Sequence, residues 1–90
     1  MRIEKNPSFN NKLFSILKYI ATNNPANAKN FKKELDKKIT ALANMPFKYR
    51  QSIYYDDMNV RDLVFKGYTV PYIIDNETIV IIDIFKWENR

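Results

Sequence analysis

The fold is decided by Gly67-Tyr68-Thr69-Val70-Pro71-Tyr72-Ile73-Ile74, the turn Asp75-Asn76-Glu77 and the run Thr78-Ile79-Val80-Ile81-Ile82-Asp83-Ile84-Phe85. Two runs of β-branched and aromatic residues around a short polar turn are typical of a β-hairpin. The second run is almost continuously apolar, which predicts a strand buried on both faces at the centre of a sheet. Pro71 has no backbone N–H, so the first strand needs a bulge or an unpaired position there.

The chain before this hairpin supplies the cover for the sheet. Residues 2–5 are expected to form a short edge strand that ends at Asn6-Pro7. Apolar residues at helical spacing predict a helix over about residues 8–22, with Ser8 as its N-cap. A turn follows, and Pro25 suits the first turn of a second helix, which Met45-Pro46 should end.

The second helix carries a regular apolar stripe. Its members are Ala28, Phe31, Leu35, Ile39 and Leu42. Residues 58–65 then alternate well enough for a strand. The order β-α-α-β-β-β predicts a single α+β domain over residues 1–90. In it, an N-terminal strand and an antiparallel helical hairpin accompany a three- to four-stranded, mainly antiparallel sheet.

The composition excludes several classes of function. The 90 residues contain neither Cys nor His, so disulfides, thiolate or imidazole metal sites and His-dependent nucleophilic catalysis are excluded. We therefore expect no metal and no cofactor. The N-terminus lacks the apolar core of a signal peptide, and no apolar run is long enough to cross a bilayer. A cytoplasmic protein without a membrane partner is the expectation.

Positive charge is concentrated in the first half of the chain. Residues 1–50 hold 11 Lys and Arg against 3 Asp and Glu, whereas residues 51–90 hold 4 against 7. Lys29, Lys33 and Lys37 form a basic face of the second helix, opposite its apolar stripe. Such a face is either a solvated surface or a site for an acidic partner, such as nucleic acid, an anionic membrane or an acidic protein segment.

Four stretches resemble the RelE/ParE superfamily of bacterial toxin–antitoxin toxins, and the ParE branch in particular. They are Leu17-Lys18-Tyr19-Ile20-Ala21, the stripe from Ala28 to Leu42 with Pro46, the loop Pro46-Phe47-Lys48-Tyr49-Arg50, and Val60-Arg61-Asp62-Leu63-Val64 with Gly67-Tyr68 and Tyr72. The resemblance covers nearly the whole chain. It implies the same α/β fold and the toxin of a type II toxin–antitoxin system, of the kind that inhibits growth and stabilises plasmids.

The resemblance also implies partners. A cognate antitoxin would neutralise the toxin by wrapping it as a helix and a strand, and DNA gyrase would be the target in the ParE branch. Tyr54, Tyr55, Phe65 and Phe85 are candidates to line an antitoxin groove, with core packing expected for at least two of them. A homodimer and a toxin–antitoxin hetero-oligomer both remain open.

Three positions depart from the ribonuclease members of the superfamily. Thr69 stands where those members commonly carry an Arg, Lys86 stands where the last strand usually ends in a His, and Pro71 replaces an aliphatic residue. These departures favour gyrase binding over cleavage of mRNA. The alternatives are a metal-independent, ribosome-dependent mRNA endonuclease (RelE-like) and a basic nucleic-acid-binding module.

Candidate site residues follow from charge, aromatic character and the matched motifs. The candidates for binding the target or the antitoxin are Lys48, Arg50, Arg61, Tyr68, Lys86 and Trp87. If the protein is an enzyme, its catalytic cations would come from Arg61, Lys66, Lys86 and Arg90, because no His is present. Arg61 stands out because an Arg within a strand needs solvent or an acidic partner, for which Asp62, Asp83 and Glu88 are the structural candidates.

Overall fold

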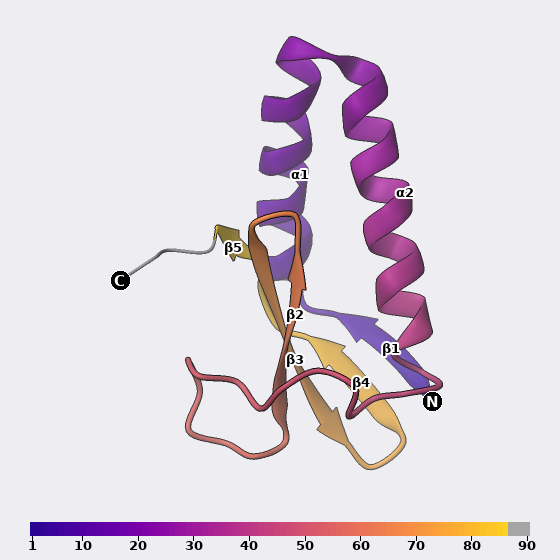
Figure 1. Cartoon of the computed structure of the whole chain (residues 1–90), viewed down its shortest axis with the longest axis vertical. Coiled ribbons are helices and arrows are strands. Elements are labelled where there is room, and N and C mark those ends of the chain that lie inside the picture. Colours follow the sequence, from indigo (N-terminus) through magenta and orange to yellow (C-terminus); the bar gives the residue numbers. More distant parts are fainter. Residues whose placement is uncertain (87–90) are drawn as a thin grey trace.

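The computed structural model describes residues 1–86. The elements are β1 (Arg2–Lys5), α1 (Pro7–Asn23), α2 (Pro25–Ala41), β2 (Val60–Phe65), β3 (Tyr68–Asp75), β4 (Thr78–Ile81) and β5 (Phe85–Lys86). The two helices form an antiparallel hairpin that extends past one end of the sheet (Figure 1). The predicted order of elements is confirmed, with one additional short strand at the C-terminal end.

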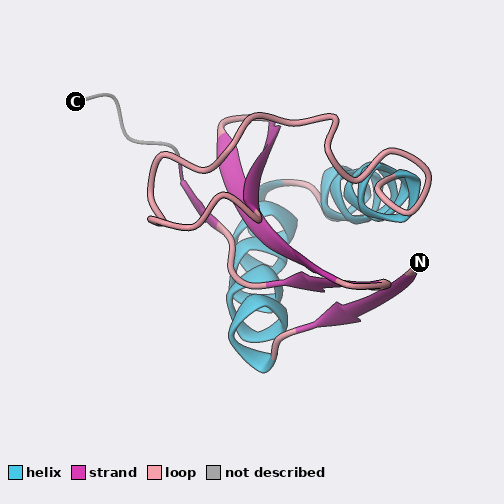
Figure 2. Ribbon diagram, turned by 90° about the horizontal axis from the view of Figure 1, so that it is seen from below, coloured by secondary structure: helices cyan, strands magenta, loops and turns pink. Residues whose placement is uncertain are grey.

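The strands form one mixed sheet in the order β1-β4-β3-β2, and β5 pairs with β3. β1 lies at one edge, as predicted, and runs parallel to β4. β3 pairs antiparallel with β2, β4 and β5. β4 therefore has a neighbour on each side, which agrees with the prediction of a central strand. The long loop between α2 and β2 lies at the end of the molecule opposite the α1–α2 turn (Figure 1), and Figure 2 shows it passing the strands on the side away from α1.

Two asparagines begin the helices. Asn6 caps α1, because its side-chain oxygen accepts from the Ser8 backbone N–H at 3.1 Å, so the prediction of Ser8 as N-cap is wrong. Asn24 ends α1 and caps α2, accepting from the backbone N–H groups of Ala26 (2.9 Å) and Asn27 (3.3 Å). A cap shared by both helices explains why the turn is so short. α2 ends at Ala41, four residues before Met45, where the sequence placed its end.

Pro71 lies opposite a bulge, which confirms the requirement for one. Tyr72 pairs with Ile81, but Thr69 pairs with Phe85, so two residues of β3 face the three residues 82–84. The Ile82 N–H donates to the Pro71 carbonyl at 2.9 Å. The Pro71 nitrogen, which carries no hydrogen, is on the same side of β3, where the pairing with residues 82–84 is interrupted. The long apolar strand predicted from Thr78 to Phe85 is therefore two strands, β4 and β5.

The core lies between the sheet and the apolar stripes of the helices. Its fully buried members include Phe9 of α1, Leu35 and Ile39 of α2, and Leu63 and Tyr72 of the sheet. The tip of the β2–β3 hairpin reaches α2, where the Phe31 ring makes edge contacts with Phe65 at 5.1 Å and Tyr68 at 5.6 Å. These contacts fix the helical hairpin on the sheet. None of the helices in residues 1–86 has the length and apolarity to cross a membrane.

Candidate functional site

Arg61 lies on β2 beneath the loop that connects α2 to the sheet. Its Nη1 donates to the Tyr49 carbonyl at 3.1 Å, and its guanidinium carbon lies 4.9 Å from the centre of the Phe47 ring. Its Nε is buried and has no hydrogen-bond partner. The guanidinium therefore joins strand and loop through one charged hydrogen bond and one cation–π contact.

The carboxylate beside Arg61 belongs to a different pair. Asp62 is fully buried, its Oδ2 accepts from the Ile53 backbone N–H at 3.2 Å, and the Arg50 guanidinium lies 3.7 Å away. Within residues 1–86, Arg61 has no carboxylate within salt-bridge distance, so the prediction that it pairs with Asp62 or Asp83 is wrong. Arg61 and Asp62 have different partners because their side chains point to opposite faces of β2. Glu88, the third predicted partner, lies outside the described residues.

Tyr72 holds the same loop from the neighbouring strand. It is paired with Arg61 across the β2–β3 ladder, and its hydroxyl donates to the Pro46 carbonyl at 2.7 Å. Burial raises the pKa of Tyr72 to about 12 and also raises the pKa of Tyr49. Tyr72 and Arg61 together fix residues 46–49, which place Lys48 and Phe47 at the surface.

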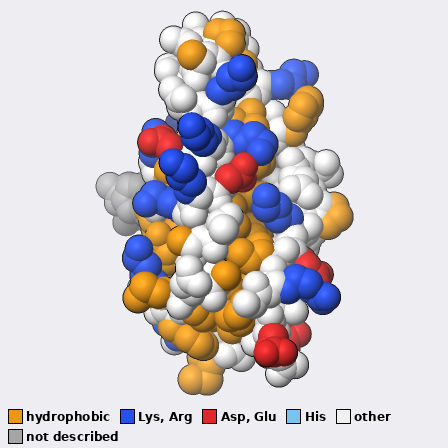
Figure 3. All heavy atoms as spheres, turned by 90° about the vertical axis from the view of Figure 1, so that its right-hand side faces the viewer, with side chains coloured by type: hydrophobic (Ala, Val, Ile, Leu, Met, Phe, Trp, Pro, Cys, Tyr) orange, Lys and Arg blue, Asp and Glu red, His pale blue; other side chains and the backbone are white. Residues whose placement is uncertain are grey.

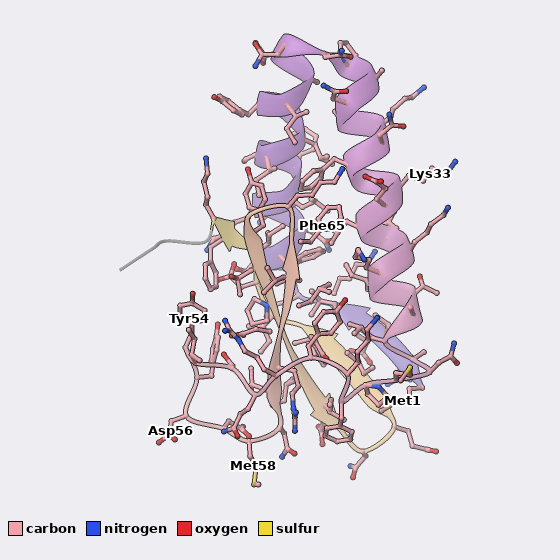
Figure 4. All side chains as sticks on the ribbon, viewed as in Figure 1. Met1, Lys33, Tyr54, Asp56, Met58 and Phe65 are labelled. Atoms are coloured by element: carbon pink, nitrogen blue, oxygen red, sulfur yellow. The ribbon has the colours of Figure 1, made fainter. Side chains whose placement is uncertain are left out.

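The outer side of this loop exposes large apolar side chains. They are Met45, Phe47, Ile53, Tyr54 and Met58. Figure 4 shows Tyr54, Asp56 and Met58 on the part of the loop farthest from the helices. The Tyr54 ring makes an edge contact with Phe85 at 5.0 Å, which ties the loop to β5. We define residues 45–58, with Arg61, as the loop surface. Its combination of exposed apolar residues with Lys48 and Arg50 is typical of a protein-binding site.

The opposite end of the sheet holds other predicted residues. Tyr68 is half-buried against Phe31 and pairs with Lys86, which is exposed. The Lys66 amine forms an ion pair with Glu34 of α2 and thereby lowers the pKa of that carboxyl. The two predicted residues Trp87 and Arg90 lie outside the described residues.

The predicted groove-lining aromatic residues divide between core and surface. Phe65 belongs to the core and Phe85 is half-buried beneath Tyr54. Tyr55 is half-buried, and burial raises the pKa of its hydroxyl. Thr69 is fully buried, and its hydroxyl has no hydrogen-bond partner. Only Phe65 of the four lies in the core, so the expectation of core packing for at least two of them is wrong, and Tyr54 is exposed.

The candidate catalytic cations do not gather. Arg61 and Lys66 are five residues apart along one extended hairpin arm, which is about 16 Å at the usual rise of a strand. Lys86 lies with Lys66 at the Tyr68 end of the sheet, away from Arg61. Across residues 1–86, no three Asp or Glu side chains are grouped as a metal site would need.

Sequence reasoning missed three partners of this site: Phe47 under the guanidinium, the Tyr49 carbonyl, and Tyr72 as the loop anchor. Phe47 and Tyr49 belong to the basic-aromatic loop that the sequence singled out, but their contact with Arg61 spans at least 12 residues. The strand register would have found Tyr72, because it places Tyr72 directly opposite Arg61.

The comparison with protein families shows to which family the chain belongs. The family described as ParE toxin of type II toxin–antitoxin system, parDE, matches residues 3–89. The chain belongs to the ParE toxin family. This ParE-family chain is also similar in structure to a solved chain titled "Chromosomal ParDE TA system from P. aeruginosa". The TM-score is 0.81 at 18% sequence identity, over 98% of this chain and 97% of the other. That likeness supports the fold. The comparison with curated proteins gave no match.

Proposed function

We propose that this ParE-family chain is the toxin of a type II toxin–antitoxin pair, is neutralised by a cognate antitoxin, and acts by binding DNA gyrase. Family membership over residues 3–89 carries the first part of the proposal. The second part is supported by the arrangement of the cations. A ribonuclease must bring an acid, a base and a charge-stabilising cation to one phosphate, and Arg61 and Lys66 are separated by about 16 Å.

The individual cations support binding in preference to cleavage. Arg61 is engaged by the Tyr49 carbonyl and the Phe47 ring, and Lys66 is engaged by Glu34. Thr69, at the position where ribonuclease members carry an Arg, is fully buried. On the loop, Phe47 and Lys48 are exposed, and these side chains suit contact with a partner better than proton transfer.

We propose that the loop surface is where the target binds. Two methods test the target directly. The purified protein should inhibit supercoiling by DNA gyrase and stabilise cleaved DNA, and primer extension on cellular mRNA should find no new ends. Codon-phased cuts in ribosome-bound mRNA would refute gyrase binding and establish the endonuclease. Co-expression with the neighbouring reading frame should restore growth, and persistent toxicity with every adjacent frame would argue against the antitoxin.

A matched pair of variants tests the loop surface. Lys48 lies 5.6 Å from the centre of the Tyr49 ring, and Lys18 of α1 lies 5.9 Å from that of Phe14. Both lysines are exposed. Lys48→Glu should weaken gyrase inhibition about tenfold, because it reverses a charge within the binding surface. Lys18→Glu makes the same charge change elsewhere and should leave inhibition within about twofold of the unchanged protein. Equal effects of the two variants would mean that only net charge matters.

A further inference from the structure

The outer side of α2 carries a row of lysines at a regular spacing. Lys29, Lys33 and Lys37 follow one another every four residues, so the row rises by about 6 Å at each step and by about 12 Å in all. All three are exposed, and we call them the lysine face. Figure 4 shows Lys33 pointing away from the sheet, and Figure 3, which views the molecule from the α2 side, shows Lys and Arg side chains gathered on its upper half. The lysine face therefore presents a line of positive charge along the helix axis.

The lysine face lacks acidic partners in the described part of the chain. The acidic residues of α2 are engaged elsewhere, since Asp36 pairs with Lys32 at 2.7 Å and with Lys5 at 3.6 Å, and Glu34 pairs with Lys66. Within residues 1–86, no carboxylate comes within salt-bridge distance of the three lysines of the face. Like charges four residues apart on a helix repel one another, and a polyanion would relieve that repulsion.

Two hollows adjoin the lysine face and add polar donors to it. One of about 660 Å³ is lined by all three lysines together with Thr40 and Asn44, and one of about 640 Å³ is lined by two of the lysines together with Asn27 and Asn30. Hydroxyl and amide groups of this kind donate to phosphate oxygens. A protein partner would need apolar anchors, but Ala41 is the only apolar residue among those that line the larger hollow.

Charge is distributed unevenly between the two ends of the molecule. Residues 7–41, which form the helical hairpin, hold seven lysines against two acidic residues. Residues 51–59 of the loop and 75–78 of the β3–β4 turn together hold four acidic residues and no Lys or Arg. These two segments lie at the end opposite the α1–α2 turn (Figure 1). Such a distribution orients the helical hairpin, and not the opposite end, toward a polyanion.

We propose that the lysine face binds the phosphate backbone of duplex DNA without reading its sequence. Phosphates of one strand recur about every 3.4 Å along the duplex axis, so a row of about 12 Å reaches three of them, one for each lysine. The helical hairpin extends past the sheet (Figure 1), which lets α2 approach the wide major groove of B-DNA. The major groove of an RNA duplex is too narrow for such an approach.

Duplex DNA also fits the lysine face better than a single strand does. Proteins that bind single strands stack the bases on aromatic rings, and none of the residues that line the larger hollow is aromatic. The proposal goes beyond the proposed function and does not depend on it, because DNA binding is measured in the absence of gyrase.

The salt dependence of DNA binding tests the proposal on the whole purified chain. The probe is a fluorescently labelled DNA duplex of about 20 base pairs, whose anisotropy is followed as protein is added at NaCl concentrations from about 50 to about 200 mM. Three phosphate contacts predict a slope of log K against log salt of about −3, so the affinity should fall about 40-fold over this range. A second duplex of unrelated sequence should give the same affinity and slope, because phosphate contacts carry no sequence information.

Two double variants of equal net charge locate the contact. Lys33→Ala with Lys37→Ala removes two of the three phosphate contacts, so the slope should fall to about −1 and the affinity at 50 mM salt at least about tenfold. Arg2→Ala with Lys18→Ala removes the same two positive charges from β1 and α1. This control should keep the slope near about −3 and the affinity within about threefold of the unchanged protein. All four positions are exposed, so both variants should fold.

Four results would overturn the proposal. The first is the absence of duplex DNA binding at 50 mM salt, and the second is an equal loss of slope in the two double variants, which would leave only a net-charge effect. The third is tighter binding of an RNA duplex of the same sequence. The fourth is tighter binding of a poly-glutamate peptide that the variant of the lysine face abolishes, which would assign the face to an acidic protein segment.

Discussion

Replacing Tyr72 by Phe tests how the loop surface is anchored. Tyr72 is fully buried, and its hydroxyl donates to the Pro46 carbonyl at 2.7 Å. Phe has the same shape without the hydroxyl, so the substitution removes one hydrogen bond and leaves a carbonyl of the loop unpaired. At neutral pH we expect the free energy of unfolding to fall by about 1 kcal/mol.

The sign of this effect should reverse in alkali. The pKa of Tyr72 is raised by burial to about 12, whereas an unfolded tyrosine titrates near 10. Between these two values the unfolded chain loses the proton and the folded chain keeps it, so the stability of the unchanged protein falls as the pH rises. The loss at pH 11 is at most about 1.4 kcal/mol. Phe does not titrate, so the stability curves of the two proteins should cross near about pH 11.

Urea unfolding followed by circular dichroism at several pH values between about 7 and 11 measures both effects. The difference between each variant and the unchanged protein cancels the titration of Tyr49 and Tyr55, which both proteins share. Tyr19→Phe is the matched control, because Tyr19 is 72% exposed, and it should change stability by less than about 0.5 kcal/mol at every pH. Equal stability of Tyr72→Phe and the unchanged protein at pH 7, with parallel alkaline losses, would refute both the anchor and the buried phenol.

Three further variants test the scaffold by denaturant unfolding. Gly67→Ala should lower the free energy of unfolding by about 1–2 kcal/mol, because the backbone φ of +83° is strained for a residue with a side chain, although there is space for a Cβ. Gly67→Asn should recover part of this loss. Asn24→Ala should cost about 1 kcal/mol, since it removes the cap of α2, while the same change at the exposed neighbour Asn23 should have little effect. Leu35→Ala should cost about 2–5 kcal/mol by opening a cavity in the core, and Leu35→Met less than about 1.5 kcal/mol; equal losses for the two would mean that the site repacks.

Much of the fold could be read from local patterns. The stripe containing Phe31, Leu35 and Ile39 predicted the buried face of α2, and these side chains lie in the core. The alternation around Leu63 and the proline at Pro71 predicted the strands and the bulge. Each of these predictions uses the spacing of residues within a window of about ten positions, in which the period of a helix or a strand can be recognised.

Boundaries were less predictable than elements. Asn6 and Ser8 are both good N-caps, and the choice between them depends on where the chain leaves β1, whose last backbone contact is the Asn6 N–H on the Ile81 carbonyl. The end of β4 likewise depends on β3, because the missing N–H of Pro71 interrupts the ladder beside Ile82. Such decisions are made by a neighbouring strand, which the local pattern does not contain.

The candidate residues themselves came from the sequence, through their types and the resemblance to a toxin family, but their partners came only from the tertiary structure. The sequence placed Arg61 and Asp62 side by side, which suggested an ion pair. Their side chains point to opposite faces of β2, so Arg61 joins the Tyr49 carbonyl and Asp62 joins Arg50. The lysine face of α2 shows the same division. Periodicity predicted the lysine face, whereas the engagement of Asp36 by Lys5, and the position of Met45 beside Lys37, depend on how the chain returns over the helix. Charge and periodicity are properties of the chain, but which charges remain free is a property of the packed molecule.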